Sequence, residues 1–487
     1  MDLFVNHQFK NLLRFNFLHV KNANIVGKKH IGIKRAPLTS EQKESVNRKF
    51  KDSLGDKDEF SSQFWSGSLK NNPGKFCLPS VSLPDKYVEA TETFLKSYDR
   101  GDLAEVGHRL KSFLSLRKPT TYKQHSLEKL LNKKNKKTDL NDSKFTIEKF
   151  ENLVDQLEDR TSNAISKSIS SFQTDTFWKS VFYDEIISAA YLMNFSAANY
   201  ASSLRVLNEL KRLDSNFSPV SVLDFGSGLG SNIWVSNELW SDSLKQYICV
   251  DSSNYMNNIC KYMLSGGNVD SYLPGIFIRN YLPVAFGSTY DLVTASYSLS
   301  EMRLPKDREN ILRLLWNKTN KYLVLIEHGN LHGHRMLMEA RNFLTRGKIG
   351  FGKSAKTMKS PIKDLGKSVA PCPHQKECPI VETAAVCKVT QKYNSPKFEP
   401  GSSNQTTTFS YLVLQKGISG DDKNNLQWPR VITLPKKRVG NCVDCMLCTP
   451  SGRAVNTQIS KNKDGNHPYT LLRKAKLGDL LPIKKKP

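Results

Sequence analysis

Cysteine residues carry the clearest chemical signal in this 487-residue chain, because six of its nine cysteines lie between positions 372 and 448. Two runs contain them: Cys372-x5-Cys378-x8-Cys387 and Cys442-x2-Cys445-x2-Cys448. Closely spaced thiolates can converge on one metal centre, and a tetrahedral zinc ion and a cubane iron–sulfur cluster both need four of them. Spacing alone favours zinc, whereas the Cys-x2-Cys-x2-Cys run is also typical of ferredoxins. The residues therefore leave zinc and an iron–sulfur cluster open.

Two neighbours of these cysteines carry weaker signals. His374 stands inside Cys-Pro-His-Gln-Lys-Glu-Cys-Pro at 372–379, where we expect a solvated turn residue rather than a ligand. Pro371–Cys372 resembles the pair that supplies the nucleophile in cytosine methylation, but it follows the fifth predicted strand instead of the fourth. We therefore assign no catalytic residue. Nine unevenly placed cysteines do not make a secreted disulfide scaffold, which indicates a reducing compartment.

A second group of residues could bind a nucleotide-like cofactor. Ser-Val-Leu-Asp-Phe-Gly-Ser-Gly-Leu-Gly-Ser at 221–231 predicts a strand, a glycine turn and a helix. Glycine is needed where the backbone turns tightly and approaches a ligand. An acid at the end of the second strand can accept hydrogen bonds from both ribose hydroxyls. The candidate cofactor residues are Asp224, Gly226, Ser227, Gly228, Gly230 and Asp251. Dinucleotide binding, S-adenosylmethionine binding and a tight turn without a ligand all fit this pattern.

The elements that would position these residues follow from periodicity. Short apolar runs alternate with helical windows from residue 218 onward, which is typical of a parallel α/β sheet. The runs lie at 220–225, 247–251, 275–278, 290–296 and 322–327. We divide the chain into a mitochondrial targeting presequence (1–35), a linker or extended segment (36–83), a helical N-terminal region (84–215), the sheet domain (216–346), a flexible basic loop (347–370) and a cysteine-rich C-terminal region (371–487).

The presequence is predicted from charge and spacing. Residues 1–35 hold seven Lys or Arg and one acid, Asp2, and their apolar residues recur at roughly helical spacing. A basic, acid-poor amphipathic helix is typical of mitochondrial presequences. A basic RNA-binding arm and a frayed terminus are the alternatives. The prediction places the mature protein in the mitochondrial matrix.

The formal net charge of +26 predicts a polyanionic partner, either nucleic acid or an anionic membrane surface. The charge is unevenly distributed. Residues 214–330 hold 9 basic and 11 acidic residues, whereas 331–399 hold 13 and 5, and 423–487 hold 14 and 3. No apolar stretch approaches the roughly 18 residues of a membrane span, so we expect none. The cysteine-bearing region, more than the sheet domain, is therefore expected to face the polyanion.

The motifs together resemble one known family. The form Asp-Phe-Gly-Ser-Gly-Leu-Gly at 224–230 resembles class I S-adenosylmethionine methyltransferases. Over roughly 180–483 the chain resembles the methyltransferase-like protein 17 family of mitochondrial small-ribosomal-subunit assembly factors. Its carrying segments are 223–230, 295–302, 325–329, 339–344, 372–379, 445–452 and 478–482. The implied fold is a Rossmann-like methyltransferase sheet domain with a helical N-terminal region and a cluster-stapled C-terminal extension.

The resemblance also implies cofactors and partners. It implies a [4Fe–4S] cluster on Cys372, Cys378, Cys387 and a fourth cysteine, for which we favour Cys448, then Cys445, then Cys442. S-adenosylmethionine is the second implied cofactor. It further implies a monomer that binds small-subunit rRNA and ribosomal proteins with little or no methyl transfer. Two alternatives stay open: an active rRNA methyltransferase, and a zinc-stapled RNA-binding module in another compartment.

Overall fold

The computed structural model describes residues 60–118, 120, 178, 180–268, 273–282, 288–352, 355–358, 362–417 and 428–485. The predicted presequence and the part of the predicted linker before residue 60 lie outside these residues. So does 121–177 of the predicted helical region. The elements described below all belong to one unit, Phe50–Pro487.

Five parallel strands form the centre of the sheet, and all five were predicted from the apolar runs. They are β2 (Ser221–Phe225), β3 (Gln246–Val250), β4 (Ile276–Arg279), β5 (Tyr290–Ser296) and β6 (Thr319–His328). Their order in the sheet is β4-β3-β2-β5-β6. Successive strands are therefore added on one side of β2 as far as β4, and on its other side from β5 onward. Open α/β sheets bind ligands at such a switch point, at the carboxyl ends of the strands.

Three later strands extend the same sheet. They are β9 (Lys367–Ala370), β10 (Val389–Asn394) and β11 (Asn404–Gln415). β11 runs antiparallel to β6, with Phe409 opposite His328, and β10 runs antiparallel to β11. β9 also pairs with β11. The sheet therefore does not end at residue 346, because β9 comes from the predicted basic loop and β10 and β11 from the predicted C-terminal region.

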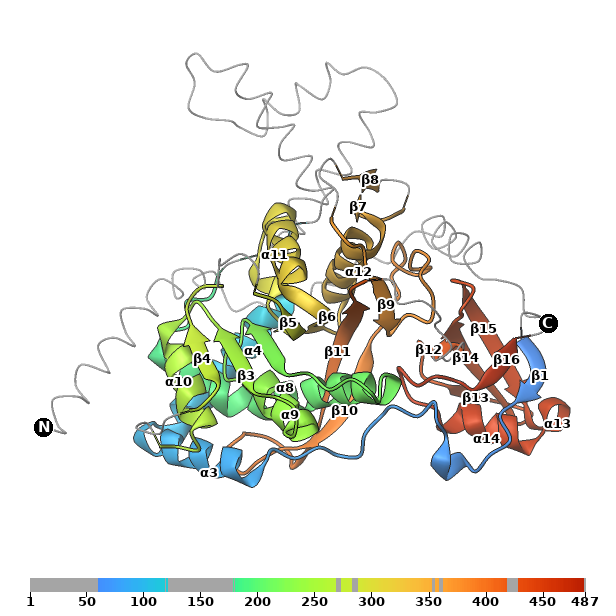
Figure 1. The fold of residues 1–487 in the computed structure, drawn as a ribbon. Coiled ribbons are helices and arrows are strands. Elements are labelled where there is room, and N and C mark those ends of the chain that lie inside the picture. The colour runs from blue at the N-terminus through green and yellow to red at the C-terminus, as the bar shows by residue number, and fades with distance from the viewer. Residues whose placement is uncertain are drawn as a thin grey trace, which may run out of the picture. The chain divides into compact units, whose positions relative to one another are not determined.

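Helices cover both faces of this sheet (Figure 1). One face carries α8 (Glu185–Leu213), α9 (Ser231–Trp240) and α10 (Asn254–Leu264), and the other carries α11 (Pro305–Lys318) and α12 (Leu331–Arg346). Alternation along β6 explains the two layers: Val324 and Ile326 join the first core, whereas Leu323 and Leu325 join the second. Buried strands of this kind are apolar on both faces, which is why their sequences read as continuous apolar runs.

Local signals set the limits of the helices. The Asp184 side chain caps α8 by accepting a hydrogen bond from the Ile187 N–H at 2.9 Å, and Lys211 and Arg212 lie in its last turn. Pro305 occupies the first turn of α11, where its missing N–H costs nothing. Gly347, at φ +61°, ends α12 in the left-handed conformation that glycine adopts readily.

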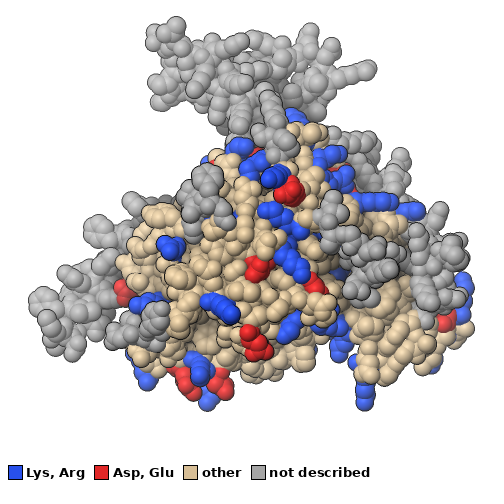
Figure 2. All heavy atoms as spheres, viewed as in Figure 1, with Lys and Arg blue, Asp and Glu red and all other residues tan. Residues whose placement is uncertain are grey.

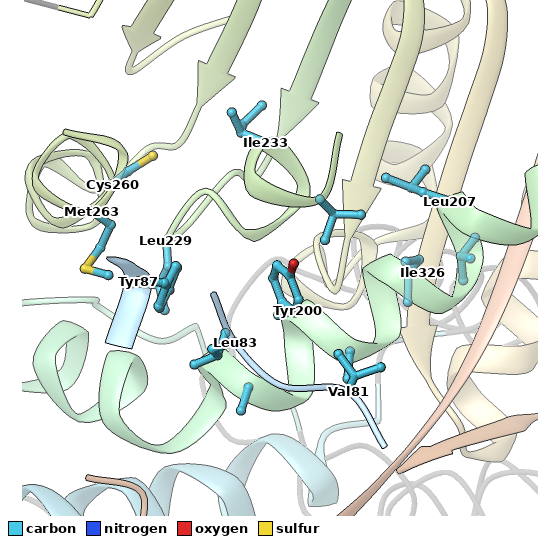
Figure 3. Packing of buried hydrophobic residues seen from close by; sticks show 14 of the residues in the cluster. Val81, Leu83, Tyr87, Tyr200, Leu207, Leu229, Ile233, Cys260, Met263 and Ile326 are labelled. Carbon is cyan, nitrogen blue, oxygen red and sulfur yellow. The ribbon is translucent and has the colours of Figure 1, made fainter. Parts of the chain in front are cut away.

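The N-terminal helices complete the first core. α3 (Asp85–Phe94) and α4 (Arg100–Leu116) confirm the helical prediction where the structure describes it. Figure 3 shows Tyr87 of α3 near Leu229 and Met263, and Tyr200 of α8 near Leu83. Residues 60–83 contain more than a linker, because Phe76, Val81 and Leu83 are buried.

The last part of the chain forms a smaller sheet. Its strands are β12 (Arg430–Val431), β13 (Lys436–Arg438), β14 (Cys442–Cys448) and β15 (Ala454–Ser460), all antiparallel. The helices α13 (Lys461–Asp464) and α14 (Asn466–Lys474) follow, and β16 (Ile483–Lys485) pairs with β1 (Phe60–Phe64). The short strands β7 (Lys348–Ile349) and β8 (Lys356–Thr357) pair within the predicted basic loop. No helix among the described residues is long and apolar enough to cross a membrane.

Candidate functional site

The glycine turn between β2 and α9 borders a cavity of about 880 Å³. Gly226, Gly228 and Gly230 all have positive φ, at +68°, +49° and +77°, so each uses the conformational freedom for which glycine was predicted. A Cβ on Gly226 would lie 2.1 Å from the Ser298 Oγ, which leaves no room for any other residue there. At Gly228 the nearest atom would be 4.0 Å away. Gly226 and Gly228 line the cavity, whereas Ser227 and Gly230 do not.

The two predicted acids have different surroundings. Asp251 lines the cavity and accepts hydrogen bonds from the N–H groups of Gly228 at 3.0 Å and Ser253 at 2.9 Å. Burial raises the pKa of Asp251, and these two N–H groups oppose the rise. A carboxylate has about four acceptor positions, so two remain for ligand hydroxyls.

Asp224 lies beneath the loop and does not border the cavity. It is 0% exposed, and its Oδ1 accepts hydrogen bonds from Thr294 Oγ1 at 2.7 Å and Asn232 Nδ2 at 2.8 Å. Burial raises the pKa of Asp224 to about 7. The structure therefore places Asp224 as a support of β2, β5 and α9 rather than in the cavity wall.

Parts of the cavity wall come from residues that were not among the predicted cofactor-binding residues. Tyr297 follows β5 with φ +58°, a strained conformation for a tyrosine, and its ring centroid lies 5.0 Å from that of His328. Burial lowers the pKa of His328 to about 4, so this ring is neutral at physiological pH. Thr406, Thr407 and Thr408 of β11 also line the cavity. Nothing in a local motif identifies them, because they reach the site only when β11 joins the sheet.

Four of the six clustered cysteines lie near one another in the structure, and Cys378 and Cys387 pack against the small core that contains Cys448. The four are Cys372, Cys378, Cys387 and Cys448. Neighbouring thiols of this set help to raise the pKa of each of the last three. Burial is the larger cause in each case, and it raises the pKa of Cys378 to about 12. The backbone N–H groups of Ile380 and Val381 act in the opposite direction on Cys378. Among the described residues, no group of three or more His, Cys, Asp or Glu is arranged to hold a metal ion.

The geometry of β14 separates its three cysteines. Successive side chains of a strand point to opposite faces, so residues 442 and 448 share one face and 445 lies on the other. Cys445 accordingly packs in the core of the small sheet, and its thiol donates to the Thr433 carbonyl at 3.2 Å. Cys442 lies at the start of the strand, with its thiol directed to the Gly440 carbonyl at 3.6 Å. Of the three, the structure brings Cys448 to the other thiols.

Two histidines lie against the thiol cluster, by which we mean Cys372, Cys378, Cys387 and Cys448. The Nε2 of His374 is 3.3 Å from the Cys448 Sγ, and the Nε2 of His334 is 3.8 Å from the Cys378 Sγ. The expectation that His374 is a solvated turn residue is wrong, because this side chain is 5% exposed. Burial lowers the pKa of both rings to about 4. His334 was missed at the sequence level, although a histidine on the apolar face of a predicted helix is a usable signal.

The order and directions of the strands define the class of protein. The series β4-β3-β2-β5-β6-β11-β10, with β11 antiparallel to its neighbours and a glycine turn after β2, is the class I methyltransferase fold. A magnesium protoporphyrin IX methyltransferase from Synechocystis, solved with bound S-adenosylmethionine, matches at a TM-score of 0.26 and 11% identity, covering 49% of this chain and 87% of that one. A likeness this low adds no argument of its own.

Sequence comparison identifies the family. The family model described as mitochondrial small ribosomal subunit Rsm22 matches residues 185–482, so the chain belongs to that family. The human ribosome assembly protein METTL17, mitochondrial, is 32% identical over 333 residues, which is 68% of this chain and 70% of the human one. The Saccharomyces cerevisiae ribosome assembly protein RSM22, mitochondrial, is 22% identical over 60% of this chain and 66% of its own length.

Proposed function

We propose that the protein is an assembly factor of the mitochondrial small ribosomal subunit. In this role it acts in the mitochondrial matrix, binds immature small-subunit rRNA and ribosomal proteins as a monomer, and supports mitochondrial translation. A [4Fe–4S] cluster on Cys372, Cys378, Cys387 and Cys448 is its structural element. Membership of the family, together with relatives named as mitochondrial ribosome assembly proteins, supports the role.

The observation that carries the cluster proposal is the meeting of four thiols from two distant segments. Residues 372–387 lie between β9 and β10 of the large sheet, whereas Cys448 ends β14 of the small sheet. The donor set fits an iron–sulfur cluster, because four thiolates hold a cubane and backbone N–H groups next to the sulfurs tune it. When bound, the cluster supplies a covalent cross-link and a redox-active group. Cys372, Cys378 and Cys387 would hold it on one sheet and Cys448 on the other.

The charge distribution supports rRNA as the polyanion. Positive charge concentrates in 331–399 and 423–487, the two segments that contribute the thiols. Figure 2 shows Lys and Arg gathered around α11, α12 and β7 on one face of the molecule. Lys and Arg side chains neutralise phosphates and release counterions, which gives salt-dependent affinity. Recognition of this kind depends mainly on the shape of the RNA.

Serine substitution tests the cluster and the assembly role together. Cys378→Ser removes one thiolate of the proposed set, whereas Cys445→Ser removes a buried thiol of the second cysteine run that faces away from the proposed set. We expect Cys378→Ser to lose iron, sulfide and visible absorbance and to dissociate from the small subunit. Cys445→Ser should keep all of these. Normal ribosome association of a cluster-free Cys378→Ser protein would contradict the proposal.

Methyl transfer to rRNA is the second candidate function, and the cavity next to Gly226, Gly228 and Asp251 is the observation that favours it. An aspartate at Gly228, where φ is +49°, would strain the turn that donates a hydrogen bond to Asp251 and would take up space at the cavity wall. If Gly228→Asp abolishes S-adenosylmethionine binding and leaves assembly intact, catalysis is dispensable. If the rRNA then lacks a specific methyl group and assembly stops, methyl transfer is part of the function.

A further inference from the structure

Arg341 is a buried cation without an anionic partner. It lies in the third turn of α12 and is 0% exposed, and only one of its hydrogen-bonding groups is used: Nη2 donates to the His374 carbonyl at 2.6 Å. Its Nε and Nη1 have no acceptor among the described residues. None of the ion pairs found in the described part of the chain includes Arg341.

An unpaired buried guanidinium is costly, because it stays protonated at every physiological pH and loses its hydration. The other buried arginines among the described residues each have a carboxylate nearby. Arg205 and Arg430 both pair with Glu209, at 2.5 Å and 2.9 Å, and Arg308 lies 3.6 Å from Glu339. Arg341 therefore differs from them in lacking a carboxylate, and its surroundings must supply another anion.

The thiol cluster is where that anion would lie. Arg341 lies on α12, whose Leu337 and Ala340 pack in the same core as Cys372. His334 is seven residues earlier on α12, two helical turns away on the same face, and its ring contacts the Cys378 Sγ. The carbonyl that Arg341 holds belongs to His374, whose ring contacts the Cys448 Sγ. One face of α12 thus directs a histidine and an arginine toward the cysteines.

Four thiolates around an oxidised [4Fe–4S] core form a dianion, and reduction adds a further negative charge. A dianion in a buried site needs a compensating cation, just as a buried cation needs an anion. Arg430 is already paired with Glu209 at 2.9 Å, whereas Arg341 has no carboxylate partner among the described residues.

We propose that Arg341 is the buried counter-charge of the metal–thiolate centre, which pairs with the cluster instead of with a carboxylate and favours its reduced form. This inference rests on the proposed iron–sulfur cluster and assigns a role to a residue that is not a ligand. Arg341 is thus a positioning residue. Its positive charge balances the negative charge of the proposed cluster, so the stability of this part of the fold depends on the cluster.

The first test compares reduction potentials of the full chain purified without oxygen. Arg341→Gln keeps a donor for the His374 carbonyl and removes the charge, Arg341→Lys keeps the charge, and Arg308→Gln is a control at another buried arginine, 4% exposed. We expect Arg341→Gln to lower the reduction potential of the cluster by at least about 59 mV, which is a tenfold shift of the one-electron equilibrium toward the oxidised form. Arg341→Lys and Arg308→Gln should stay near the wild-type value. An unchanged potential in Arg341→Gln would overturn the inference.

The second test separates a counter-charge from a packing role. Without the cluster, the wild-type chain carries an unpaired buried cation, so Arg341→Met should unfold at the same or a higher temperature than the wild type. With the cluster, Arg341→Met should release iron several-fold faster than the wild type. A purely structural arginine would instead lower the unfolding temperature in both states, and that result would overturn the inference.

Two further outcomes also test the inference about Arg341. If Arg341→Gln and Arg341→Met both fail to fold while Arg341→Lys folds with the cluster bound, the site requires the positive charge, and the inference stands. If Lys fails as well while Arg308→Gln folds, Arg341 is a packing residue and the inference is wrong. Iron and sulfide analysis of the wild type is independent of all these variants. Zinc without iron there would refute the proposed cluster itself, whatever the variants do.

Discussion

The cavity at the glycine turn and the thiol cluster are built in opposite ways. The cofactor-binding edge predicted for the cavity comes from a short stretch of chain, since Gly226, Gly228 and Asp251 lie within one strand–turn–helix–strand unit, while β11 adds Thr406 to another part of the wall. The thiol cluster joins 372–387 to Cys448, across two sheets. The glycine edge of the cavity therefore depends on local backbone geometry, whereas the thiol cluster depends on how two parts of the chain pack. A metal centre on the thiols would hold the small sheet against the large one.

The largest effect expected from this difference is on the stability of the small sheet. Cys448→Ser should abolish cluster binding and expose β14 and β15 to amide hydrogen exchange, because structural metal centres contribute directly to folding. Cys442→Ser, on the same strand but outside the cluster, is the matched control. Binding of S-adenosylmethionine by Cys448→Ser should be unchanged. If exchange in β14 is the same in both variants, the thiols do not join the two sheets.

The reciprocal change should affect the cavity alone. Gly228→Asp is expected to weaken S-adenosylmethionine binding at least 100-fold, about 2.7 kcal/mol, by filling the cavity and adding a charge beside Asp251. Gly266→Asp is its control, since Gly266 also has positive φ, at +66°, and lies outside the cavity. Calorimetry measures the binding, and iron content should equal wild type in both variants. Loss of the cluster in Gly228→Asp would show that the two sites are coupled.

A smaller effect concerns Asp224 and pH. Its pKa in the folded state, about 7, lies above its ordinary value of 3.8, so the folded protein holds this proton more tightly than the unfolded chain. The stability that Asp224 contributes is therefore complete below about pH 4 and is lost as pH rises through 7. Asp224→Asn should remove up to about 4 kcal/mol of this pH dependence, measured by denaturant unfolding from pH 4 to 8. Asp242→Asn, at an exposed position, should leave the slope unchanged.

If Asp224→Asn abolishes S-adenosylmethionine binding while the protein stays folded, the assignment of Asp224 as a support is wrong. Glu327 and Glu339 also have pKa values raised to about 7 by burial, so part of the pH dependence should persist in the variant. The comparison with wild type isolates the share that belongs to Asp224.

The smallest expected effect is on the salt dependence of RNA binding. Lys436→Gln and Lys437→Gln change exposed lysines of β13, next to the cysteine-bearing strand. Each should reduce the slope of log affinity against log salt by roughly 0.7 to 0.9. Lys245→Gln and Lys261→Gln, at exposed positions of the near-neutral sheet domain, should not change it. Equal slopes for the two pairs would mean that the RNA does not prefer the cysteine-bearing region.

Much of the fold was predictable because its signals are local. The five parallel strands, the glycine turn and the helical character of the described residues of 84–215 follow from patterns that lie within each element. β9, β10 and β11 were assigned to other regions, because a strand does not carry in its own sequence the identity of the sheet that it joins. β11 pairs with β6 across about 80 residues of chain, and that pairing also brings Thr406 to the cavity.

The candidate sites divide in the same way. Residue type and spacing by themselves determined the glycine turn, the acid at position 251 and the set of six cysteines from which a metal centre could be drawn. Only the tertiary structure decided that Cys448, and not Cys445, meets the other thiols, that His374 is buried, and that Arg341 lies beside them without a carboxylate. The physical reason is that sequence specifies which groups are available and how each short segment turns. Burial and charge pairing, in contrast, depend on packing between segments that are far apart in the chain.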